Sequence, residues 1–172
     1  MLTKPNNNVS LREFRYTDVT RIAEFCNNKK IWDNLRDILP FPYTEKDADF
    51  FVGKCRNESP QYTFAVEYNG EFAGCIGLES QTDIHKYSAE LGYWIGEPFW
   101  GLGIASEAVI QIEKYGFSEL KLARIYASVY DFNKASQRVL EKAGFQLEGI
   151  FKKSVYKNGK FCNEHRYGKI SE

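Results

Sequence analysis

The most informative part of this sequence is Trp100-Gly101-Leu102-Gly103-Ile104-Ala105-Ser106-Glu107-Ala108, in which two glycines lead directly into a helical pattern. An apolar, aromatic run over 91–95 precedes it, so we expect a strand, a glycine loop and a helix. The first N–H groups of a helix have no partner within it and form the positive end of its dipole, which favours phosphate binding. No lysine follows the second glycine, which excludes a P-loop, and only one glycine matches the dinucleotide fingerprint. The same glycines also fit an ordinary tight turn.

Length, composition and charge limit what kind of protein this is. With 172 residues and 43% hydrophobic content, the chain is predicted to form one folded domain over residues 1–172. Its 23 basic and 23 acidic residues balance, so we expect no nucleic-acid or membrane partner. The four cysteines lack metal-ligand spacing, which predicts free thiols and no metal site. Without a signal or membrane-spanning segment, a cytoplasmic protein is expected, working as a monomer or homodimer.

Hydrophobic periodicity predicts the order strand, helices, three strands, helix, strand, helix and two strands. The expected strands are 9–15, 63–68, 72–79, 87–95, 123–130, 145–154 and 161–169, and the expected helices begin near Asp18, Ile31, Thr44, Ile104 and Lys134. The second of these helices is expected to continue to Leu39, where prolines follow. Asn69-Gly70 and Asn158-Gly159 are strong hairpin signals.

Two segments resemble signatures of one family. The glycine loop, with Ala89-Glu90-Leu91-Gly92-Tyr93-Trp94-Ile95 before it, closely resembles the acetyl-CoA loop of the GNAT N-acetyltransferases, nearest the RimJ/RimL branch. The segment Asn133-Lys134-Ala135-Ser136, followed by a helix and Gly144-Phe145, resembles the second signature of that family. The predicted element order also agrees over nearly the whole chain. The resemblance implies an α/β (α+β) fold with a central mixed, mostly antiparallel sheet of about seven strands flanked by helices.

The resemblance also implies acetyl-CoA as cosubstrate. Its diphosphate would be bound by backbone N–H groups of the loop, and its pantetheine arm would lie against a splayed strand edge at 92–95. An N–H group near Trp94 or Ile95 would stabilise the oxyanion. Asn133 would either bind the cofactor or only cap its helix, and both roles remain open. The predicted cofactor-binding residues are Trp94, Ile95, Trp100, Gly101, Leu102, Gly103, Ile104, Ala105, Ser106, Asn133 and Ser136.

Proton transfer is assigned to two candidate catalytic residues, Glu90 and Ser136. Glu90 is the candidate base, because a protonated amine has no lone pair with which to attack. It also fits a surface carboxylate paired with a lysine, and Glu164 and His165 are weaker candidates. Many family members have a tyrosine proton donor at the position of Leu140, which cannot donate. Ser136, another tyrosine or water would then replace it, or the thiolate would leave unaided.

Acceptor binding is expected from aromatic residues that also fit a hydrophobic core, namely Trp32, Phe41, Tyr43 and Tyr156. The resemblance implies transfer to a primary amine by direct attack in a ternary complex, with a protein N-terminal α-amine or a small-molecule amine as acceptor. The alternative is a CoA-binding sensor without turnover, which the leucine at Leu140 would favour. Four lysines of the last hairpin, Lys152, Lys153, Lys157 and Lys160, form a solvated face or a docking patch for an acidic partner.

Overall fold

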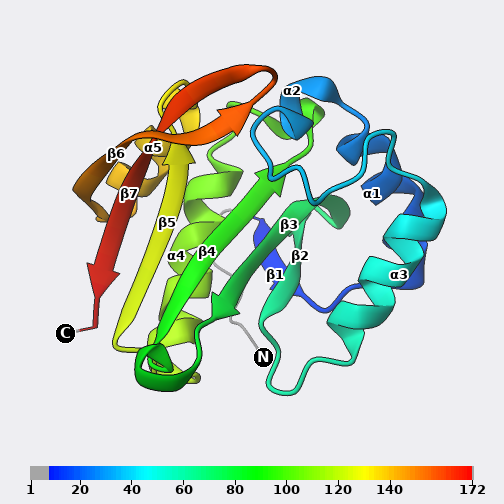
Figure 1. The fold of residues 1–172 in the computed structure, drawn as a ribbon. Helices are drawn as coiled ribbons and strands as arrows, with labels where there is room; N and C mark the ends of the chain where they lie inside the picture. The colour runs from blue at the N-terminus through cyan, green and yellow to red at the C-terminus, as the bar shows by residue number, and fades with distance from the viewer. Residues whose placement is uncertain (1–7, 172) are drawn as a thin grey trace. The chain divides into compact units, whose positions relative to one another are not determined.

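The computed structural model describes residues 8–171 and contains a seven-stranded sheet in the order β1-β2-β3-β4-β5-β7-β6 (Figure 1). The strands are β1 (Val9–Arg12), β2 (Thr63–Tyr68), β3 (Glu71–Ser80), β4 (Ser88–Ile95), β5 (Arg124–Tyr130), β6 (Gln146–Lys157) and β7 (Lys160–Ile170). β4 and β5 are parallel, whereas β1–β2, β2–β3, β5–β7 and β6–β7 are antiparallel. The predicted mixed, mostly antiparallel sheet is therefore confirmed.

The two predicted hairpin turns are present where the strands reverse. Asn69 and Gly70 have φ angles of 51° and 86°, and Asn158 and Gly159 have 51° and 76°. Two consecutive residues with positive φ are what a two-residue turn of type I′ requires, and asparagine and glycine adopt this conformation at low cost.

The main helices begin where the sequence predicts them. The structure contains α1 (Val19–Cys26), α2 (Lys29–Trp32), α3 (Glu45–Arg56), α4 (Ile104–Ser118) and α5 (Lys134–Lys142), with the 3₁₀ turns η1 (Tyr16–Asp18), η2 (Asp83–His85) and η3 (Glu97–Phe99). Thr44 accepts a hydrogen bond from the Asp47 N–H at 3.2 Å, and the Asp47 carboxylate accepts one from the Thr44 N–H at 2.8 Å. This capping box fixes the start of α3.

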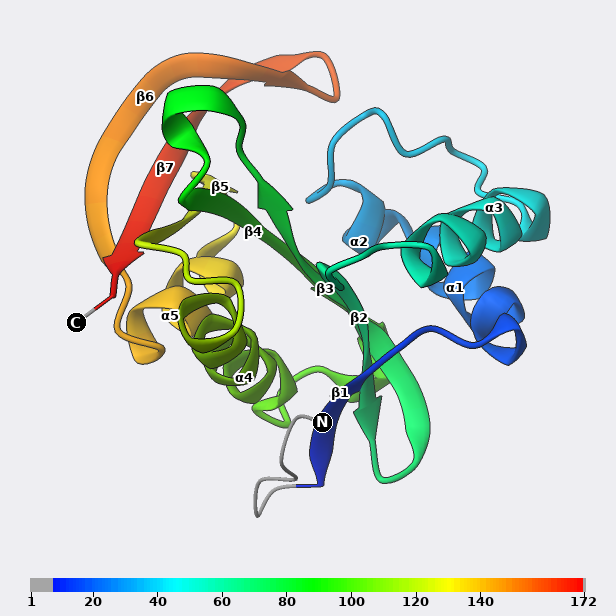
Figure 2. The same ribbon diagram turned by 90° about the horizontal axis from the view of Figure 1, so that it is seen from below.

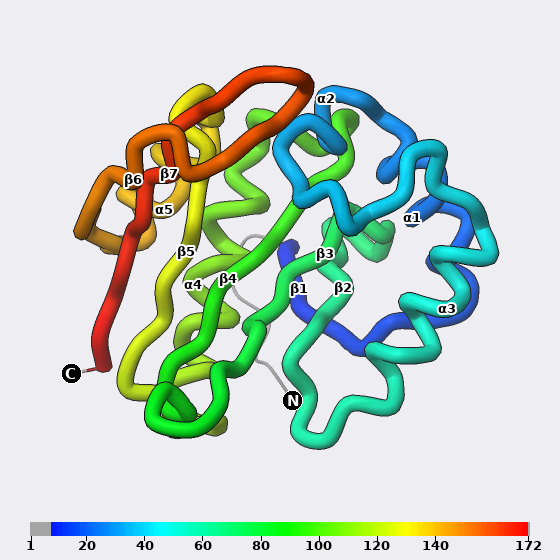
Figure 3. The backbone as a smooth tube through the Cα atoms, in the orientation of Figure 1, coloured from blue at the N-terminus to red at the C-terminus, as the bar shows by residue number. Residues whose placement is uncertain are grey.

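The expected helix from Ile31 to Leu39 is wrong in its length. The helix α2 covers only one turn and ends at Trp32. The Trp32 indole N–H then donates to the Leu39 carbonyl at 3.0 Å, which closes the following segment into a loop (Figure 3). A tertiary contact of this kind overrides local helix propensity, and Pro40 and Pro42 end any continuation.

Contacts divide the chain into two compact units. The first consists of Met1–Gly77 and Tyr93–Ala108. In it, α1, α2 and α3 lie together on one side of β1–β3 (Figure 2) and enclose a core that includes Phe14, Phe25 and Phe72. The ring centroids of Phe14 and Phe72 are 6.3 Å apart, and the stacked rings of Phe25 and Phe72 have centroids 6.2 Å apart. Burial of such aromatic surface is the main stabilisation of this unit.

The second unit consists of Leu78–Gly92 and Val109–Glu172. Ile125, Ala127 and Val129 are buried, while the residues between them on β5 are partly exposed. A Cβ atom on Gly116 of α4 would lie 2.9 Å from the Ile125 side chain, so the helix packs closely on the buried face of β5. The opposite face of β5 is thereby left for polar side chains.

Among the described residues, no helix is both long and apolar enough to cross a membrane.

Candidate functional site

The glycine loop lies in the first unit, directly before α4. Gly101 and Gly103 have φ angles of 78° and 75°, a region that side chains other than glycine rarely adopt. A Cβ atom built on either glycine would meet no other atom within 4 Å. The loop therefore presents bare backbone next to open space, as close approach by a ligand requires.

The backbone N–H groups of residues 103–106 have no hydrogen-bond acceptor among residues 8–171. The first N–H group of this region with a partner is that of Glu107, which donates to the Gly103 carbonyl at 3.2 Å. These unpaired donors stand at the N-terminus of a 15-residue helix, where the helix dipole adds positive potential. The arrangement suits the diphosphate of a cofactor.

The turn before the loop is held by Trp100. Its indole N–H donates to the Ile95 carbonyl at 2.7 Å, and its backbone N–H donates to the Glu97 carbonyl at 3.1 Å. The Trp100 side chain, predicted to bind the cofactor, is thus engaged in closing the turn between β4 and the loop. A cofactor contact would have to come from the face of the ring or from the backbone.

The end of β4 lies unusually close to β3. A Cβ atom on Gly74 would be only 2.3 Å from the Trp94 carbonyl oxygen, so no side chain fits at position 74. The Trp94 ring packs against Phe25 and Phe72, with ring centroids 6.3 and 6.0 Å apart, and Ile95 is buried. The Trp94 side chain packs against the core and the Ile95 side chain is buried, so the predicted cofactor contacts of these residues would have to come from their backbone.

In the second unit, the parallel ladder between β4 and β5 ends at the pair Glu90 and Tyr126. β5 continues to pair with β7 on its other side as far as Tyr130 and Glu164. Neither Leu91 nor Gly92, the last two β4 residues of this unit, has a partner on β5 in that ladder. β5 thus extends beyond its last β4 partner, as expected where a strand edge opens.

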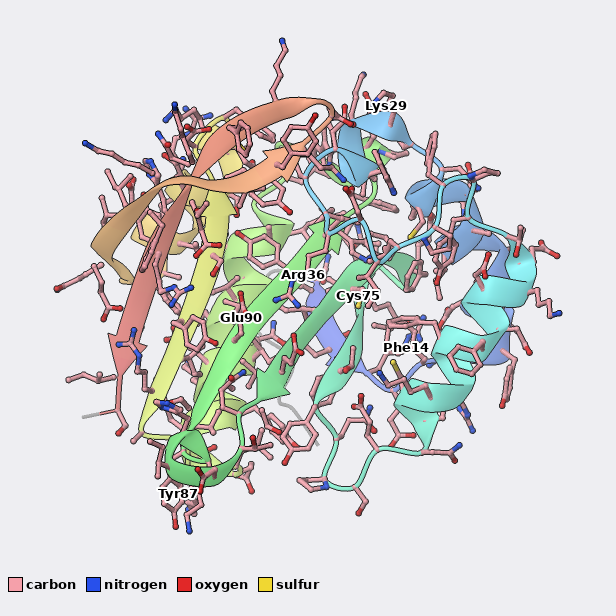
Figure 4. All side chains as sticks on the ribbon, viewed as in Figure 1. Phe14, Lys29, Arg36, Cys75, Tyr87 and Glu90 are labelled. Atoms are coloured by element: carbon pink, nitrogen blue, oxygen red, sulfur yellow. The ribbon has the colours of Figure 1, made fainter. Side chains whose placement is uncertain are left out.

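Glu90 is partly exposed and lies on the face of β4 opposite the buried Ala89 and Leu91 (Figure 4). Tyr126, its register partner on β5, lies beneath the Arg166 guanidinium at 5.2 Å from its ring centroid. Arg166 also forms an ion pair with Glu164 at 2.8 Å. The candidate base Glu90 therefore lies on a strand face next to aromatic and charged groups, and the weaker candidate Glu164 forms an ion pair there.

The N-terminus of α5 settles part of the open question about Asn133. Its Oδ1 accepts a hydrogen bond from the Ser136 N–H at 3.1 Å, so this side chain caps the helix. Ser136 lies in the first turn and is partly exposed. Leu140 is fully buried and can donate no proton. Gln137, which the sequence did not single out, is buried and donates to the Tyr130 and Asp131 carbonyls, fixing the end of β5 to α5.

The four predicted acceptor residues differ in how far the structure buries them. In the first unit, the Trp32 and Phe41 rings are in contact with centroids 5.1 Å apart, and Phe41 is 46% exposed. Tyr43 instead is 7% exposed and belongs to the core, where burial raises the pKa of its hydroxyl. In the second unit, Tyr156 is 61% exposed and pairs with Phe161 at 5.0 Å on the β6–β7 hairpin. Phe41 and Tyr156 are exposed and Trp32 is partly exposed, whereas Tyr43 is part of the core.

Sequence reasoning missed a polar link between Asn28 and Glu97, joined by a hydrogen bond of 2.5 Å. The two residues are 69 positions apart, so no local spacing could have indicated the pair.

The cysteines are free, and three of them lie in the core of the first unit. Burial raises the pKa of the Cys26 and Cys55 thiols to about 12 and that of Cys75 well above its ordinary value. Cys162 is partly exposed. No group of histidine, cysteine, aspartate or glutamate in the described part of the chain is arranged to hold a metal ion.

We expect only Cys162 to react with an aromatic disulfide reagent in the native protein at about pH 8, because it is partly exposed, whereas the other three thiols are buried away from the reagent. Unfolding should expose all four thiols. Above about pH 9 the buried thiols would ionise more readily in the unfolded chain than in the folded protein. The free energy of unfolding should therefore decline as the pH rises above this value. Counting reacted thiols by mass spectrometry before and after denaturation tests this. Rapid native reaction of a second thiol would contradict it.

The acetyltransferase (GNAT) domain family matches residues 8–146 of this chain. The putative ribosomal N-acetyltransferase YdaF of Bacillus subtilis is 36% identical over 91% of the chain and 87% of its own length. The spermidine N(1)-acetyltransferase of Escherichia coli is 27% identical over 93% of the chain and 84% of its own length.

Two solved structures are similar to the chain. A GNAT-family acetyltransferase from Bacillus anthracis is 29% identical, with a TM-score of 0.80 over 95% of both chains. RimJ from Mycobacterium smegmatis in complex with CoA-disulfide is 23% identical, with a TM-score of 0.84 over 95% of this chain and 82% of RimJ. At 23% identity, the similarity to RimJ shows a shared fold only.

Proposed function

Because the chain belongs to the GNAT family of acetyltransferases, we propose that it transfers an acetyl group from acetyl-CoA to a protein N-terminal α-amine by direct attack in a ternary complex. Acetyl-CoA is the acetyl donor of this family, and the chain is an N-acetyltransferase. The finer assignment to an α-amine is supported by the similarity to a putative ribosomal N-acetyltransferase.

The proposal depends most on the unpaired N–H groups of residues 103–106. They match the acceptor oxygens of a diphosphate in chemistry and sign, and charge-assisted hydrogen bonds of this type are stronger than neutral ones. The two glycines of the loop leave the space that such a group needs. We assign the diphosphate to this loop, and the pantetheine arm to the backbone of Trp94 and Ile95.

For the chemical step we propose Glu90 as the base that deprotonates the amine, directly or through water. As the amine nitrogen forms the new C–N bond, an N–H group at Trp94 or Ile95 would stabilise the oxyanion. The C–S bond of the thioester then breaks, and the Ser136 hydroxyl would donate a hydrogen bond to the CoA thiolate that leaves. Bringing the two reactants together supplies much of the acceleration, for which roughly 7–11 kcal/mol is available in favourable cases. No covalent acyl-enzyme is needed.

Two classes of acceptor have to be distinguished, because a similar protein is a spermidine acetyltransferase. In this chain the β6–β7 hairpin carries exposed Lys152, Lys153 and Lys160 and no acidic residue between Gly149 and Asn163. This segment would repel a polycation and tolerate a polypeptide. We therefore place a peptide α-amine ahead of a polyamine.

The test is an acetylation assay with acetyl-CoA and a panel of amines, in which products are identified by mass spectrometry. The panel should contain a short peptide with a free N-terminus, the same peptide N-terminally blocked, spermidine and a small primary amine. We expect turnover of the free peptide and none of its blocked form. Acetylation of spermidine alone would overturn the peptide assignment. Tight CoA binding without consumption of any acceptor would favour the sensor.

A further inference from the structure

In the first unit, two side chains join the α1–α2 turn to η3. The Asn28 amide donates to one carboxylate oxygen of Glu97 at 2.5 Å, and the Lys30 ammonium forms an ion pair with the other oxygen. The hydrogen bonds from Lys30 and Asn28 lower the pKa of Glu97, so it stays ionised near neutral pH. Glu97 thus holds two groups from the α1–α2 region at once.

Asn28 has a second role through the other end of its amide. Its Oδ1 accepts a hydrogen bond from the Lys30 N–H at 2.9 Å and caps α2. The helix is a single turn that ends at Trp32, whose ring contacts Phe41. Asn28 therefore sets where α2, and with it the Trp32–Phe41 pair, lies relative to Glu97.

Glu97 belongs to a turn with little freedom to move. The Gly96 N–H donates to the Ala73 carbonyl at 2.8 Å, and Trp100 closes the turn on Ile95 and Glu97. A Cβ atom on Gly96 would lie 2.7 Å from the Phe25 ring of α1, so α1 also rests directly on this backbone. The turn leads without a break into Gly101, so Glu97 links the α1–α2 region to the fixed backbone that precedes the glycine loop.

We propose that Asn28 and Glu97 are positioning residues for acetyl transfer, which hold the Trp32–Phe41 pair at a fixed distance from the glycine loop. The inference rests on the proposed function, since that is where Trp32 and Phe41 are assigned to the acceptor and the loop to acetyl-CoA. Neither residue has to touch a reacting atom. A misplacement of reactants by 1 Å can lower the rate by about 10²-fold. Loss of the single hydrogen bond between Asn28 and Glu97 can therefore lower the rate of acetyl transfer measurably.

The test reverses the direction of the hydrogen bond. Asn28→Asp keeps a good helix cap but places a second carboxylate against Glu97. Glu97→Gln removes the charge, and the double variant Asn28→Asp/Glu97→Gln restores a hydrogen bond in which the glutamine amide donates to the aspartate. We expect Asn28→Asp to lower kcat/KM for the best acceptor of the panel by about 30- to 100-fold. The double variant should recover to within about fivefold of Glu97→Gln alone.

Two further readouts separate positioning from general damage. CoA affinity, measured by calorimetry, should change less than about threefold in Asn28→Asp, because the loop donors are retained. The deficit of Asn28→Asp relative to wild type should narrow at lower pH, since protonation of one carboxylate allows the pair to share a hydrogen bond. Melting temperatures of all variants are compared, and recovery in the double variant itself shows that the single variant has not lost function by unfolding.

Glu24→Gln is the matched control, because it removes a carboxylate from an exposed ion pair with Arg21 on α1, in the same unit. It should leave kcat/KM unchanged within about twofold. Single-variant effects that simply multiply in the double variant, or an unimpaired Asn28→Asp, would overturn the positioning role while leaving acetyl transfer intact. A wild-type protein that acetylates no amine would overturn the proposed function and this inference together.

Discussion

Gly103→Ala should weaken CoA binding by about 30-fold, equivalent to the loss of one charge-assisted hydrogen bond of about 2 kcal/mol. The added methyl group would occupy the open space over the loop, at a residue with φ of 75°. Relaxing this φ toward the usual region would also turn the neighbouring N–H groups away from a bound diphosphate. Calorimetric titration with CoA measures the effect directly, without requiring a known acceptor.

The matched control for this variant is Gly70→Ala, because Gly70 has φ of 86° and an added methyl group there would also meet no other atom within 4 Å. Gly70 lies in the β2–β3 hairpin of the same unit. Both variants should lose about 1–2 kcal/mol of stability from the strained backbone. Only Gly103→Ala should lose CoA affinity. Equal CoA affinity in the two variants would contradict the assignment of the diphosphate to the loop.

Local signals in the sequence were sufficient to predict much of the fold. The capping box at Thr44, the Asn-Gly turns and the glycines before Ile104 act within a few residues, and the structure has an element boundary at each. The prediction of a helix that reaches Leu39 was wrong, because the Trp32 indole N–H donates to the Leu39 carbonyl and closes this segment into a loop. That partner is chosen by packing, and helix periodicity contains no information about it.

The candidate site was predictable to the extent that it consists of backbone. The unpaired N–H groups of the loop follow from the order strand, glycines, helix, which is a local property. Side-chain roles were less accessible. The sequence could not separate capping from cofactor binding at Asn133, nor core from pocket at Tyr43, because each depends on burial and partners. The link between Asn28 and Glu97 has no local signature at all.

Glu90→Gln tests whether Glu90 is the base that deprotonates the acceptor amine. Glutamine has nearly the same shape but cannot accept the amine proton, so we expect kcat to fall by about 10²–10⁴-fold. The deficit should shrink at higher pH, where more of the acceptor amine is unprotonated before it binds. CoA affinity should be unchanged, since no backbone donor of the loop is altered.

Glu164→Gln provides the comparison, because this carboxylate also lies on the sheet of the second unit and is held by Arg166 at 2.8 Å. Loss of a partly exposed ion pair costs little, so its kcat should stay within about threefold of wild type. If Glu90 were only a surface carboxylate, the two variants would behave alike and deprotonation would have to be assigned to water. If kcat instead fell strongly in Glu164→Gln while Glu90→Gln stayed active, Glu164 on β7 would be assigned as the base. The ratio of the two kcat values therefore separates a catalytic carboxylate from a structural one on the same sheet.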